Sequence, residues 1–397
     1  MTSFHPSAPW VYLDNNATTQ GDSRVVNAML PFFREHFANP SSAHALGTAS
    51  KEAVTSARRQ VQSLLGAESE NEIIFTSGGT ESNNTAILSA LEVQTGRNEI
   101  VTSVVEHPSV LAVCGHLERM GQAVVRRIPV DESGRLDRDA YRSALSENTA
   151  LVSMQWANNE TGTLFPVGEL AEEAHEAGAL FHSDAMQAAG KVAIRAQSTQ
   201  IDMLSISAHK MHGPKGVGAL YLRSGTRLHP LLRGGKQERG RRAGTENTPA
   251  IVGFGLAADL ANQSLRHEMP RIAALRDHME DEILRRVPGS MSIGNWNNRL
   301  PNTLNIAFEN IEADSLLTVL DRSHIAVSSG SACATGSMEP SHVLRSMKVP
   351  FPYLRGGIRF SFSRENSEDD VTRVLEVLPR AIENLRVAMV PMEAAYA

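Results

Sequence analysis

Lys210 stands in this sequence where a reactive amine could be held. The apolar residues Ile201, Leu204 and Ile206 precede it, and a glycine-rich turn, residues 212–218, follows it. A lysine beside buried strands is partly removed from water, which lowers its pKa and favours the neutral amine. Because a neutral amine can form a Schiff base with an aldehyde or a ketone, Lys210 is a candidate catalytic residue. The alternative is an ordinary basic loop in which this lysine faces water.

A glycine turn elsewhere in the sequence could hold a phosphate group. Gly78, Gly79 and Thr80 follow a predicted strand, residues 72–76, and open a predicted helix. The free backbone N–H groups at the start of a helix bind phosphate well. The alternative is a simple turn in which Thr80 only caps the helix.

A histidine, an acid and an amide also follow predicted strands. His107 follows residues 99–104 and precedes a proline that starts a helix, so its imidazole could stack on a flat ring and transfer protons. Asp184 ends the predicted strand 179–183, and its carboxylate could pair with a protonated pyridine nitrogen. Gln187, three residues later, could reach a ring hydroxyl. The alternatives are an incidental polar histidine and an aspartate that caps a helix.

Residues 156–162 place amides and a carboxylate after a further predicted strand. Such groups are costly to bury unless they bind something. Asn158 could donate to a phenolate or carboxylate oxygen, or it could merely form an Asx turn. Ligands of parallel sheets bind beyond the carboxyl ends of the strands, where all these side chains are expected. Together they are the groups that bind pyridoxal phosphate (PLP) and use it as an electron sink.

The two cysteines of the sequence lie in different settings. Cys333 lies among small residues in segment 327–337, which predicts an exposed and mobile loop whose thiolate a nearby cation would favour. Cys114 lies on a predicted helix, where a buried apolar thiol is expected. Two cysteines are too few for a disulfide framework or a cysteine-rich structural metal site.

Two arginine-containing segments complete the candidates. Arg359 alternates with apolar residues on a predicted strand, residues 356–362. If its side chain points inward, it could clamp a substrate carboxylate through two hydrogen bonds, and if it points outward it is a surface residue. Residues 233–245 are basic and glycine-rich, which raises the question of a phosphate or nucleic-acid role. As a single short segment in an acidic protein, they are interpreted as a dimer contact.

Composition narrows the class of protein. The sequence has 397 residues, 41% hydrophobic and 21% charged, with 38 basic and 44 acidic side chains and a net charge of −6. These values are typical of globular proteins and do not indicate a nucleic-acid binder. The first ten residues lack the features of a signal peptide, and no apolar run approaches the ~20 residues that span a bilayer. We therefore expect a cytoplasmic protein without a membrane partner.

The elements that position these residues alternate between strands and helices. Strands are predicted at residues 72–76, 99–104, 123–129, 150–154, 179–183 and 202–207. Helical spacing lies between them, as in residues 47–66, which predicts an α/β fold with a mainly parallel sheet.

From about Pro249 the pattern changes, and a second domain is predicted. A long helical stretch, interrupted at Pro270, continues to residue 287, and short strands follow at 303–308 and 357–362. A closing helix, residues 367–385, begins with Ser367 as its N-cap and carries an apolar face.

Taken in order, these residues resemble the cysteine desulfurases, the class V branch of the fold type I PLP enzymes, and most closely the nitrogen-fixation type. The match covers nearly the whole chain and includes segments 12–19, 39–42, 76–82, 106–108, 158–162, 184–187, 239–247 and 328–333 and the lysine segment. The basic segment 233–247 favours the nitrogen-fixation type over the housekeeping type.

The resemblance implies a fold and two domains. A large PLP-binding domain, residues 15–260, would hold a mainly parallel seven-stranded sheet flanked by helices. A smaller α+β domain, residues 1–14 and 261–397, would carry the loop of the catalytic cysteine.

The resemblance also implies how the cofactor is held. Lys210 would bind PLP, His107 would stack on its ring, and Asp184 would pair with the ring nitrogen. Gln187 and Asn158 would contact the ring oxygen or the substrate. The phosphate would be held by Gly79, Thr80, Ser207 and His209, and by Thr245 from the other subunit of a homodimer.

The implied reaction removes sulfur from L-cysteine. Asn158 and Arg359 would hold the substrate carboxylate, while Lys210 and His107 move protons. The Cys333 thiolate would then take the sulfur as a persulfide and release alanine. An iron–sulfur scaffold protein would accept the sulfur, for nitrogenase maturation, so that Cys333 would meet iron only transiently at a nascent cluster.

Two alternatives remain open from the sequence. A selenocysteine lyase or another class V PLP enzyme, such as an aminotransferase, would share the cofactor residues without needing the Cys333 loop. A non-catalytic sulfur-carrier or scaffold subunit would keep the fold for protein contacts alone.

Overall fold

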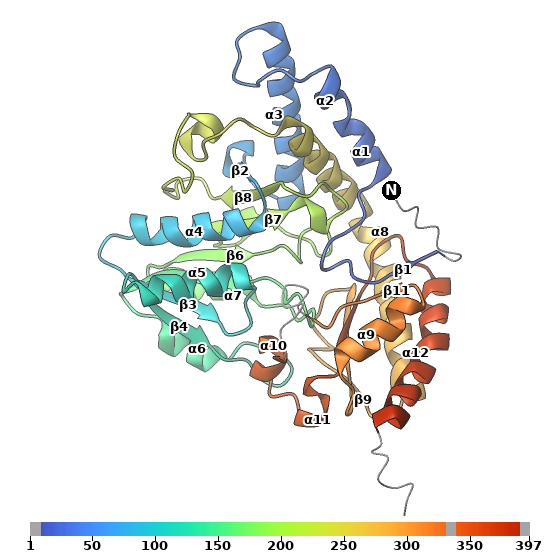
Figure 1. The fold of residues 1–397 in the computed structure, drawn as a ribbon. Coiled ribbons are helices and arrows are strands. Elements are labelled where there is room, and N and C mark those ends of the chain that lie inside the picture. Colours follow the sequence, from blue (N-terminus) through green and yellow to red (C-terminus); the bar gives the residue numbers. More distant parts are fainter. Residues whose placement is uncertain (1–8, 331–338, 390–397) are drawn as a thin grey trace, which may run out of the picture.

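A seven-stranded sheet forms the centre of the larger part of the molecule (Figure 1). The computed structural model describes residues 9–330 and 339–389. The strand order is β2-β8-β7-β6-β5-β3-β4, and only β8 runs against its neighbours. The strands are β2 (Ile73–Thr76), β3 (Glu99–Ser103), β4 (Val124–Ile128), β5 (Thr149–Gln155), β6 (Leu180–Asp184), β7 (Met203–Ser207) and β8 (Gly218–Leu222). The predicted mainly parallel sheet is confirmed.

Helices cover both faces of this sheet, which explains why its central strands β5, β6 and β7 are buried along almost their whole length. Ile74 and its neighbours on one face pack against α4 (Gly79–Val93) and α5 (Pro108–Arg119). Phe75 and the residues of the other face belong to a larger core with α3, α7 and the first half of α8 (Thr248–Arg286). The remaining helices here are α1 (Ser23–Met29), α2 (Pro31–Arg34), α3 (Ala45–Leu65), α6 (Arg138–Ala144) and α7 (Val167–Glu176).

Helix α3 shows how local sequence sets the helix ends. The His44 side chain accepts a hydrogen bond from the Gly47 N–H and caps the first turn. Gly66 ends the helix with φ 57°, a left-handed conformation that favours glycine. The apolar face between these ends, including Val61 and Leu65, is buried, as the helical spacing predicted.

The smaller part has its own core. Its antiparallel sheet has the order β12-β10-β9, and a parallel pair joins β1 (Val11–Tyr12) to β11 (Ile325–Ala326). The other elements are β9 (Ser290–Ser292), β10 (Thr303–Phe308), α9 (Ala313–Arg322), α10 (His342–Ser346), α11 (Phe351–Leu354), β12 (Gly357–Ser361) and α12 (Glu368–Met389). The predicted apolar face of α12 lies in this core.

Helix α8 (Thr248–Arg286) joins the two cores. Its first half packs in the large core with Phe254, and its second half packs in the small core with Met279. The helix continues through Pro270, where the sequence predicted an interruption. The predicted domain boundary at residues 260 and 261 falls inside α8 and stays a prediction. No helix in residues 9–330 and 339–389 is long and apolar enough to cross a membrane.

Candidate active site

Two cavities adjoin at the carboxyl ends of the parallel strands. One, of about 220 Å³, is lined by residues that follow β3, β6 and β7, and the other, of about 360 Å³, lies at the start of α4. They share Gly79, Thr80, Ser207 and His209. The structure therefore brings together eight of the predicted site residues in the first cavity: Gly79, Thr80, His107, Asp184, Gln187, Ser207, His209 and Lys210.

Lys210 lies on the short turn that follows β7, and a segment before α1 holds this turn in place. The lysine Nζ donates hydrogen bonds to the backbone oxygens of Asn16 (2.5 Å) and Ala17 (2.9 Å). The Thr19 hydroxyl donates to the backbone oxygen of His209 at 2.9 Å. The Lys210 amine is thus held at the cavity wall by the N-terminal segment.

His107 caps α5 with its imidazole. Its Nδ1 accepts a hydrogen bond from the Ser109 N–H at 3.1 Å, so the proton of the neutral ring is on Nε2. Burial lowers the pKa of His107, the nearby Asp184 charge opposes this shift, and Lys210 adds to it. A neutral ring with one donor at Nε2 lines the cavity.

Asp184 ends β6 without starting a helix, so it does not serve as the helix cap that was the alternative. One carboxylate oxygen accepts from the Met186 N–H (3.0 Å) and the other from Asn83 Nδ2 (2.8 Å). Asn83 also donates to the Ser109 hydroxyl, which lies 2.8 Å from His107 Nδ1. Sequence reasoning missed Asn83, whose only signal was its place one helical turn after the glycines.

The start of α4 provides a cradle for a phosphate. No side chain caps this helix, so its first N–H groups face the 360 Å³ cavity without competition from a cap. A Cβ on Gly79 would come within 2.2 Å of the flexible end of the Met186 side chain, which would have to move to make room. Burial, with Lys210 and Lys215 nearby, lowers the pKa of His209 to about 4. Lys215 also lines this cavity.

In the structure, the polar atoms of the Asn158 side chain bond within the protein. Its Oδ1 accepts from the N–H groups of Glu160 and Thr161 (both 2.9 Å), and its Nδ2 donates to the Val105 oxygen (3.1 Å). This is the Asx-turn alternative. Its predicted contact with cofactor and substrate stays a prediction. The adjacent Asn159 lines the 220 Å³ cavity, and sequence reasoning missed it because two asparagines stand side by side.

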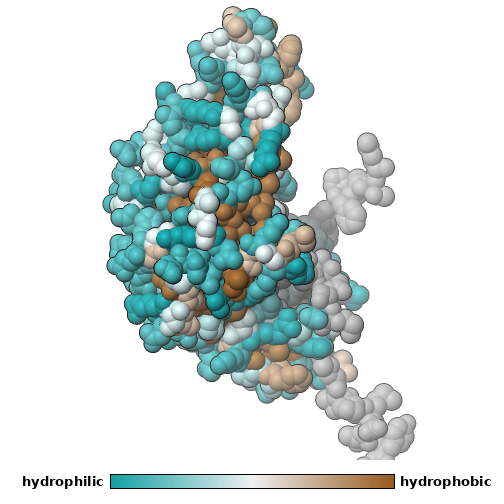
Figure 2. All heavy atoms as spheres, turned by 90° about the vertical axis from the view of Figure 1, so that its left-hand side faces the viewer, coloured by the Kyte–Doolittle hydropathy of each residue, from teal (hydrophilic) through white to brown (hydrophobic). Residues whose placement is uncertain are grey.

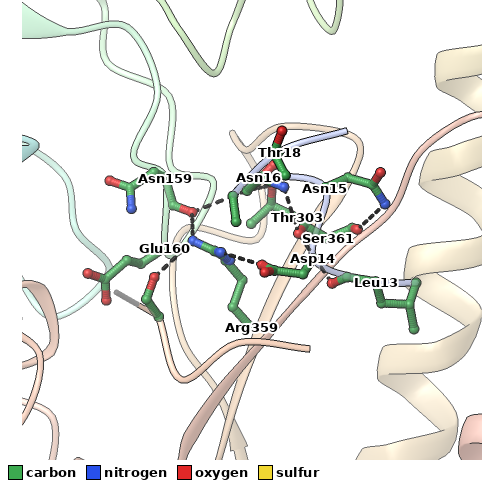
Figure 3. A network of polar contacts seen from close by, with 12 residues as sticks. Leu13, Asp14, Asn15, Asn16, Thr18, Asn159, Glu160, Thr303, Arg359 and Ser361 are labelled. Carbon is green, nitrogen blue, oxygen red and sulfur yellow. Dashed lines mark hydrogen bonds and ion pairs between the residues drawn. The ribbon is translucent and has the colours of Figure 1, made fainter. Parts of the chain in front are cut away.

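Arg359 points inward from β12, and Figure 3 shows its guanidinium among protein oxygens. It is 2% exposed, forms an ion pair with Asp14 at 2.7 Å, and donates to the backbone oxygens of Asn159 (3.1 Å) and Gly330 (2.8 Å). Its burial rules out the surface alternative. The Arg359 side chain does not line either cavity, and its predicted hold on a substrate carboxylate stays a prediction.

The remaining candidates lie elsewhere. Thr245 is exposed and lines neither cavity. Cys333 lies outside the described residues. Cys114 is fully buried on α5, as predicted, and burial raises the pKa of its thiol to about 12. In the described part of the chain, no group of three or more His, Cys, Asp or Glu side chains could hold a metal ion.

The residues present fit PLP. The uncapped start of α4 and the hydroxyl of Ser207 suit a phosphate, and the adjoining cavity is lined by an acid, an imidazole, an amide and an amine. Gln155 Nε2 is buried with no hydrogen-bond partner among the described residues, and Gln155 lines this same cavity. An unpartnered buried donor is expected where a polar ligand is to bind.

Comparisons with known proteins agree with this geometry. The family model of the class-V aminotransferases matches residues 11–374. A cysteine desulfurase of Gluconacetobacter diazotrophicus is 60% identical, over 95% of this chain and 94% of its own. The cysteine desulfurase NifS of Azotobacter vinelandii is 54% identical, over 95% and 93% of the two chains. A solved NifS-like protein superposes with a TM-score of 0.88 at 36% identity, over 95% and 100% of the two chains.

The match spans both cores and all eight cavity residues, and the relatives are covered over almost their whole length. The chain therefore belongs to the aminotransferase class-V family, whose cofactor is PLP, and within that family to the cysteine desulfurases.

Proposed function

We propose that this cysteine desulfurase transfers the sulfur of L-cysteine to Cys333 as a persulfide and supplies it to an iron–sulfur scaffold protein for nitrogenase maturation. The observation that carries the proposal is the cavity in which Lys210, His107 and Asp184 converge beside a phosphate cradle. The relative named NifS supports the nitrogen-fixation type.

Each cavity residue has a chemical task in this proposal. PLP, when bound, supplies an electron sink that weakens the bonds at the carbon atoms of the substrate. Asp184, already fixed by Asn83, would keep the ring nitrogen protonated. The Lys210 amine and His107 Nε2 would move protons at the substrate, and both line the same cavity.

Sulfur transfer needs a thiolate from the Cys333 segment. In the proposed step a bond forms between the Cys333 sulfur and the substrate sulfur as the carbon–sulfur bond of the substrate breaks. The electron pair of the broken bond stays on carbon, which takes up a proton and leaves as alanine. The persulfide then passes to the acceptor, so the contact of Cys333 with iron is one with cargo.

The substrate carboxylate would be held by Asn158 and Arg359, beside Asn159 of the cavity wall. Arg359 donates to the Asn159 backbone oxygen, so the guanidinium is next to the cavity wall. Its Nε has no hydrogen-bond partner among the described residues, so it could donate to a carboxylate while the bonds to Asp14 and the Gly330 oxygen remain. A bidentate arginine contact would hold the substrate in one orientation.

The proposed assembly is a homodimer in which Thr245 reaches the phosphate of the other subunit. Figure 2 shows the left-hand side of Figure 1, where hydrophobic side chains gather near the middle of a mostly hydrophilic face. Leu231 and Leu232, in the segment that leads to Thr245, are 39% and 41% exposed. Exposed apolar side chains of this kind often mark protein interfaces.

Sulfide and alanine production from L-cysteine tests the proposal. The wild-type protein should form alanine and, with a reductant, sulfide in equal amounts, and Cys333→Ala should lose both. Cys114→Ala is the matched control, because its thiol is buried and its replacement should leave turnover unchanged. Wild-type rates in Cys333→Ala would contradict the persulfide step.

Two readouts separate the alternatives. Selenocysteine offered beside cysteine distinguishes a lyase, which would turn over selenocysteine without Cys333. A protein that neither binds PLP nor shows its visible absorption band would be the non-catalytic carrier or scaffold. For the nitrogenase role, deletion of the gene should lower nitrogenase activity while other iron–sulfur enzymes keep theirs.

A further inference from the structure

Lys191 is a buried lysine near the candidate active site to which neither the sequence nor the proposed reaction gives a task. It lies in the turns that follow β6, four residues after Gln187, and is 7% exposed. Burial lowers its pKa well below the ordinary value, and the charges of Lys210 and Arg359 add to the shift. A buried lysine is costly unless its amine has partners.

The partners of Lys191 are two side chains of the site. Its Nζ donates to Gln187 Oε1 at 2.7 Å and to Asn16 Oδ1 at 3.2 Å. It also lines, together with Lys210, a small cavity of about 40 Å³. Among the described residues, Lys191 therefore donates to Gln187, which lines the cofactor cavity, and to Asn16, which contacts Lys210.

These contacts fix the orientation of the Gln187 amide. On one side the Asn16 backbone oxygen, which can only accept, lies 3.0 Å from Gln187 Nε2. On the other side Lys191 donates to Oε1. With one N–H of Nε2 bonded to Asn16 and Oε1 bonded to Lys191, the second N–H of Nε2 is the donor that the amide has left for a ligand in the 220 Å³ cavity that Gln187 lines.

Asn16 extends the same arrangement to the amine of Lys210. Its backbone oxygen accepts from Lys210 Nζ at 2.5 Å. Its side chain donates to the Asn159 oxygen (3.2 Å) and to the Thr303 hydroxyl (2.9 Å) of the smaller part, as Figure 3 shows. Asn16 is held from several directions, and Lys191 supplies one of the donors that fix its Oδ1.

We propose that Lys191 is a positioning residue: its amine locks the Gln187 amide and the Asn16 side chain so that the Gln187 donor and the Lys210 amine face the cofactor ring. The inference rests on the proposed place of PLP in this cavity. It concerns a residue that lines neither cavity of that site, while Lys191 and Lys210 both line the small cavity of about 40 Å³.

A double-mutant cycle tests this role through cofactor binding. The variants are Lys191→Met, which keeps the length of the side chain but removes the donor, Gln187→Leu, and the two combined. The dissociation constant of PLP is measured by titration of the cofactor-free proteins, and the position of the visible absorption band is recorded after loading. Lys191→Met should weaken PLP binding about tenfold and shift the band, because a buried amide oxygen loses its donor.

The combined variant distinguishes positioning from a general loss of structure. If Lys191 acts through Gln187, Lys191→Met should cost less than about twofold in the Gln187→Leu background. Lys191→Gln, whose side chain is too short to reach Gln187, should fold more readily than Lys191→Met and show the same loss of PLP affinity.

Arg276→Met is the control, because Arg276 is another buried cation, 7% exposed on α8, that bonds to the Leu300 oxygen. It should lower the unfolding temperature without changing PLP affinity.

Three results would overturn the inference. Binding within twofold of wild type in Lys191→Met or Lys191→Gln would do so, and so would an equal cost in both backgrounds. Failure of the wild-type protein to bind PLP would instead remove the proposed function and the inference with it.

Discussion

Glu106, directly before His107 in the chain, is fully buried, and its burial shifts the pKa of its carboxyl group. Its Oε1 accepts from the Ser103 hydroxyl (2.7 Å) and the Gln155 N–H (2.9 Å), and its Oε2 has no partner among the described residues. Burial raises the pKa of this carboxyl from 4.5 to about 8. The group is therefore protonated in the native state at neutral pH and ionised when the chain unfolds.

The stability of the protein should fall as the pH rises from about 4.5 to about 8, because the native state holds a proton that the unfolded state has lost. Glu106→Gln keeps the acceptor oxygen and removes this titration. Relative to wild type, the variant should gain stability between pH 5 and pH 8, by up to about 4 kcal/mol. Urea unfolding of the cofactor-free proteins at both pH values measures the gain. Parallel pH profiles would refute the assignment.

Substitution of Asn158 and of Asn159, one at a time, should distinguish an effect on protein stability from an effect on ligand binding. Asn158 has its polar atoms bonded to protein, so Asn158→Ala should lower the free energy of unfolding by about 2–3 kcal/mol. Asn159 lines the cavity, so Asn159→Ala should mainly weaken substrate or cofactor binding, by about three- to tenfold. Thermal unfolding and PLP titration of both variants decide between them. The reverse pattern would support the ligand-binding role of Asn158 that the sequence predicted.

At the residue scale, the sequence singled out positions that follow strands, and the structure brings them to one cavity. His107, Asp184 and Lys210 each stand at the end of an apolar run, and parallel strands bring such positions together. Asn83 and Lys191 could not be found in this way, because their roles depend on contacts across the fold. Asn83, for example, bonds to Asp184, which is 101 residues further along the chain. Nor can a strand end tell which of two adjacent asparagines points into a cavity.

At the scale of elements, the start of α4 depends on a glycine. A Cβ on Gly79 would come within 2.2 Å of the end of the Met186 side chain, which itself lines the cofactor cavity. Gly79→Ala should therefore push Met186 into the cavity and weaken PLP binding about tenfold, since such overpacking costs about 1–3 kcal/mol. Adding Met186→Ala should recover most of the affinity. PLP titration of the three proteins measures both effects.

Gly168 provides the matched control for this glycine. It lies in the first turn of α7, and a Cβ there would meet nothing within 4 Å. Gly168→Ala should leave PLP affinity unchanged and stabilise the protein by about 0.5–1 kcal/mol. If Gly79→Ala behaves in the same way, close approach at the start of α4 is not what shapes the cradle.

The order of the elements could be read from the sequence because strand and helix periodicities alternate clearly. The course of α8 could not be predicted from the sequence. Pro270 lacks a backbone N–H and normally breaks a helix, yet α8 passes through it between its two buried halves. Tertiary packing on both sides of Pro270 therefore outweighs the local cost, and that packing is invisible in the local pattern.

For the molecule as a whole, the site lies where separate parts of the chain meet. Asp14 and Asn16, close to the N-terminus, bond to Arg359 and Thr303 of the smaller part, and Asn16 also bonds to Lys210 of the larger part. Figure 1 shows β1 and its flanking segment beside this junction. Movement of one core relative to the other would therefore disturb the groups around the Lys210 amine.

The proposed homodimer gives a binding role to Thr245, which is exposed and lines neither cavity of its own chain. If Thr245 completes the phosphate site of the other subunit, Thr245→Ala homodimers should bind PLP about tenfold more weakly, through loss of a hydrogen bond to a charged group. Lys210→Ala homodimers should lack the visible band of the loaded cofactor. A mixed dimer of one Thr245→Ala chain and one Lys210→Ala chain has one site with an intact Lys210, and this site receives Thr245 from the Lys210→Ala chain. The two chains carry different tags so that the mixed dimer can be purified. Half of its sites should show the visible band, and these should bind PLP with wild-type affinity. A mixed dimer whose visible-band site binds PLP as weakly as Thr245→Ala, or a monomer in light scattering, would show that each chain builds its site alone.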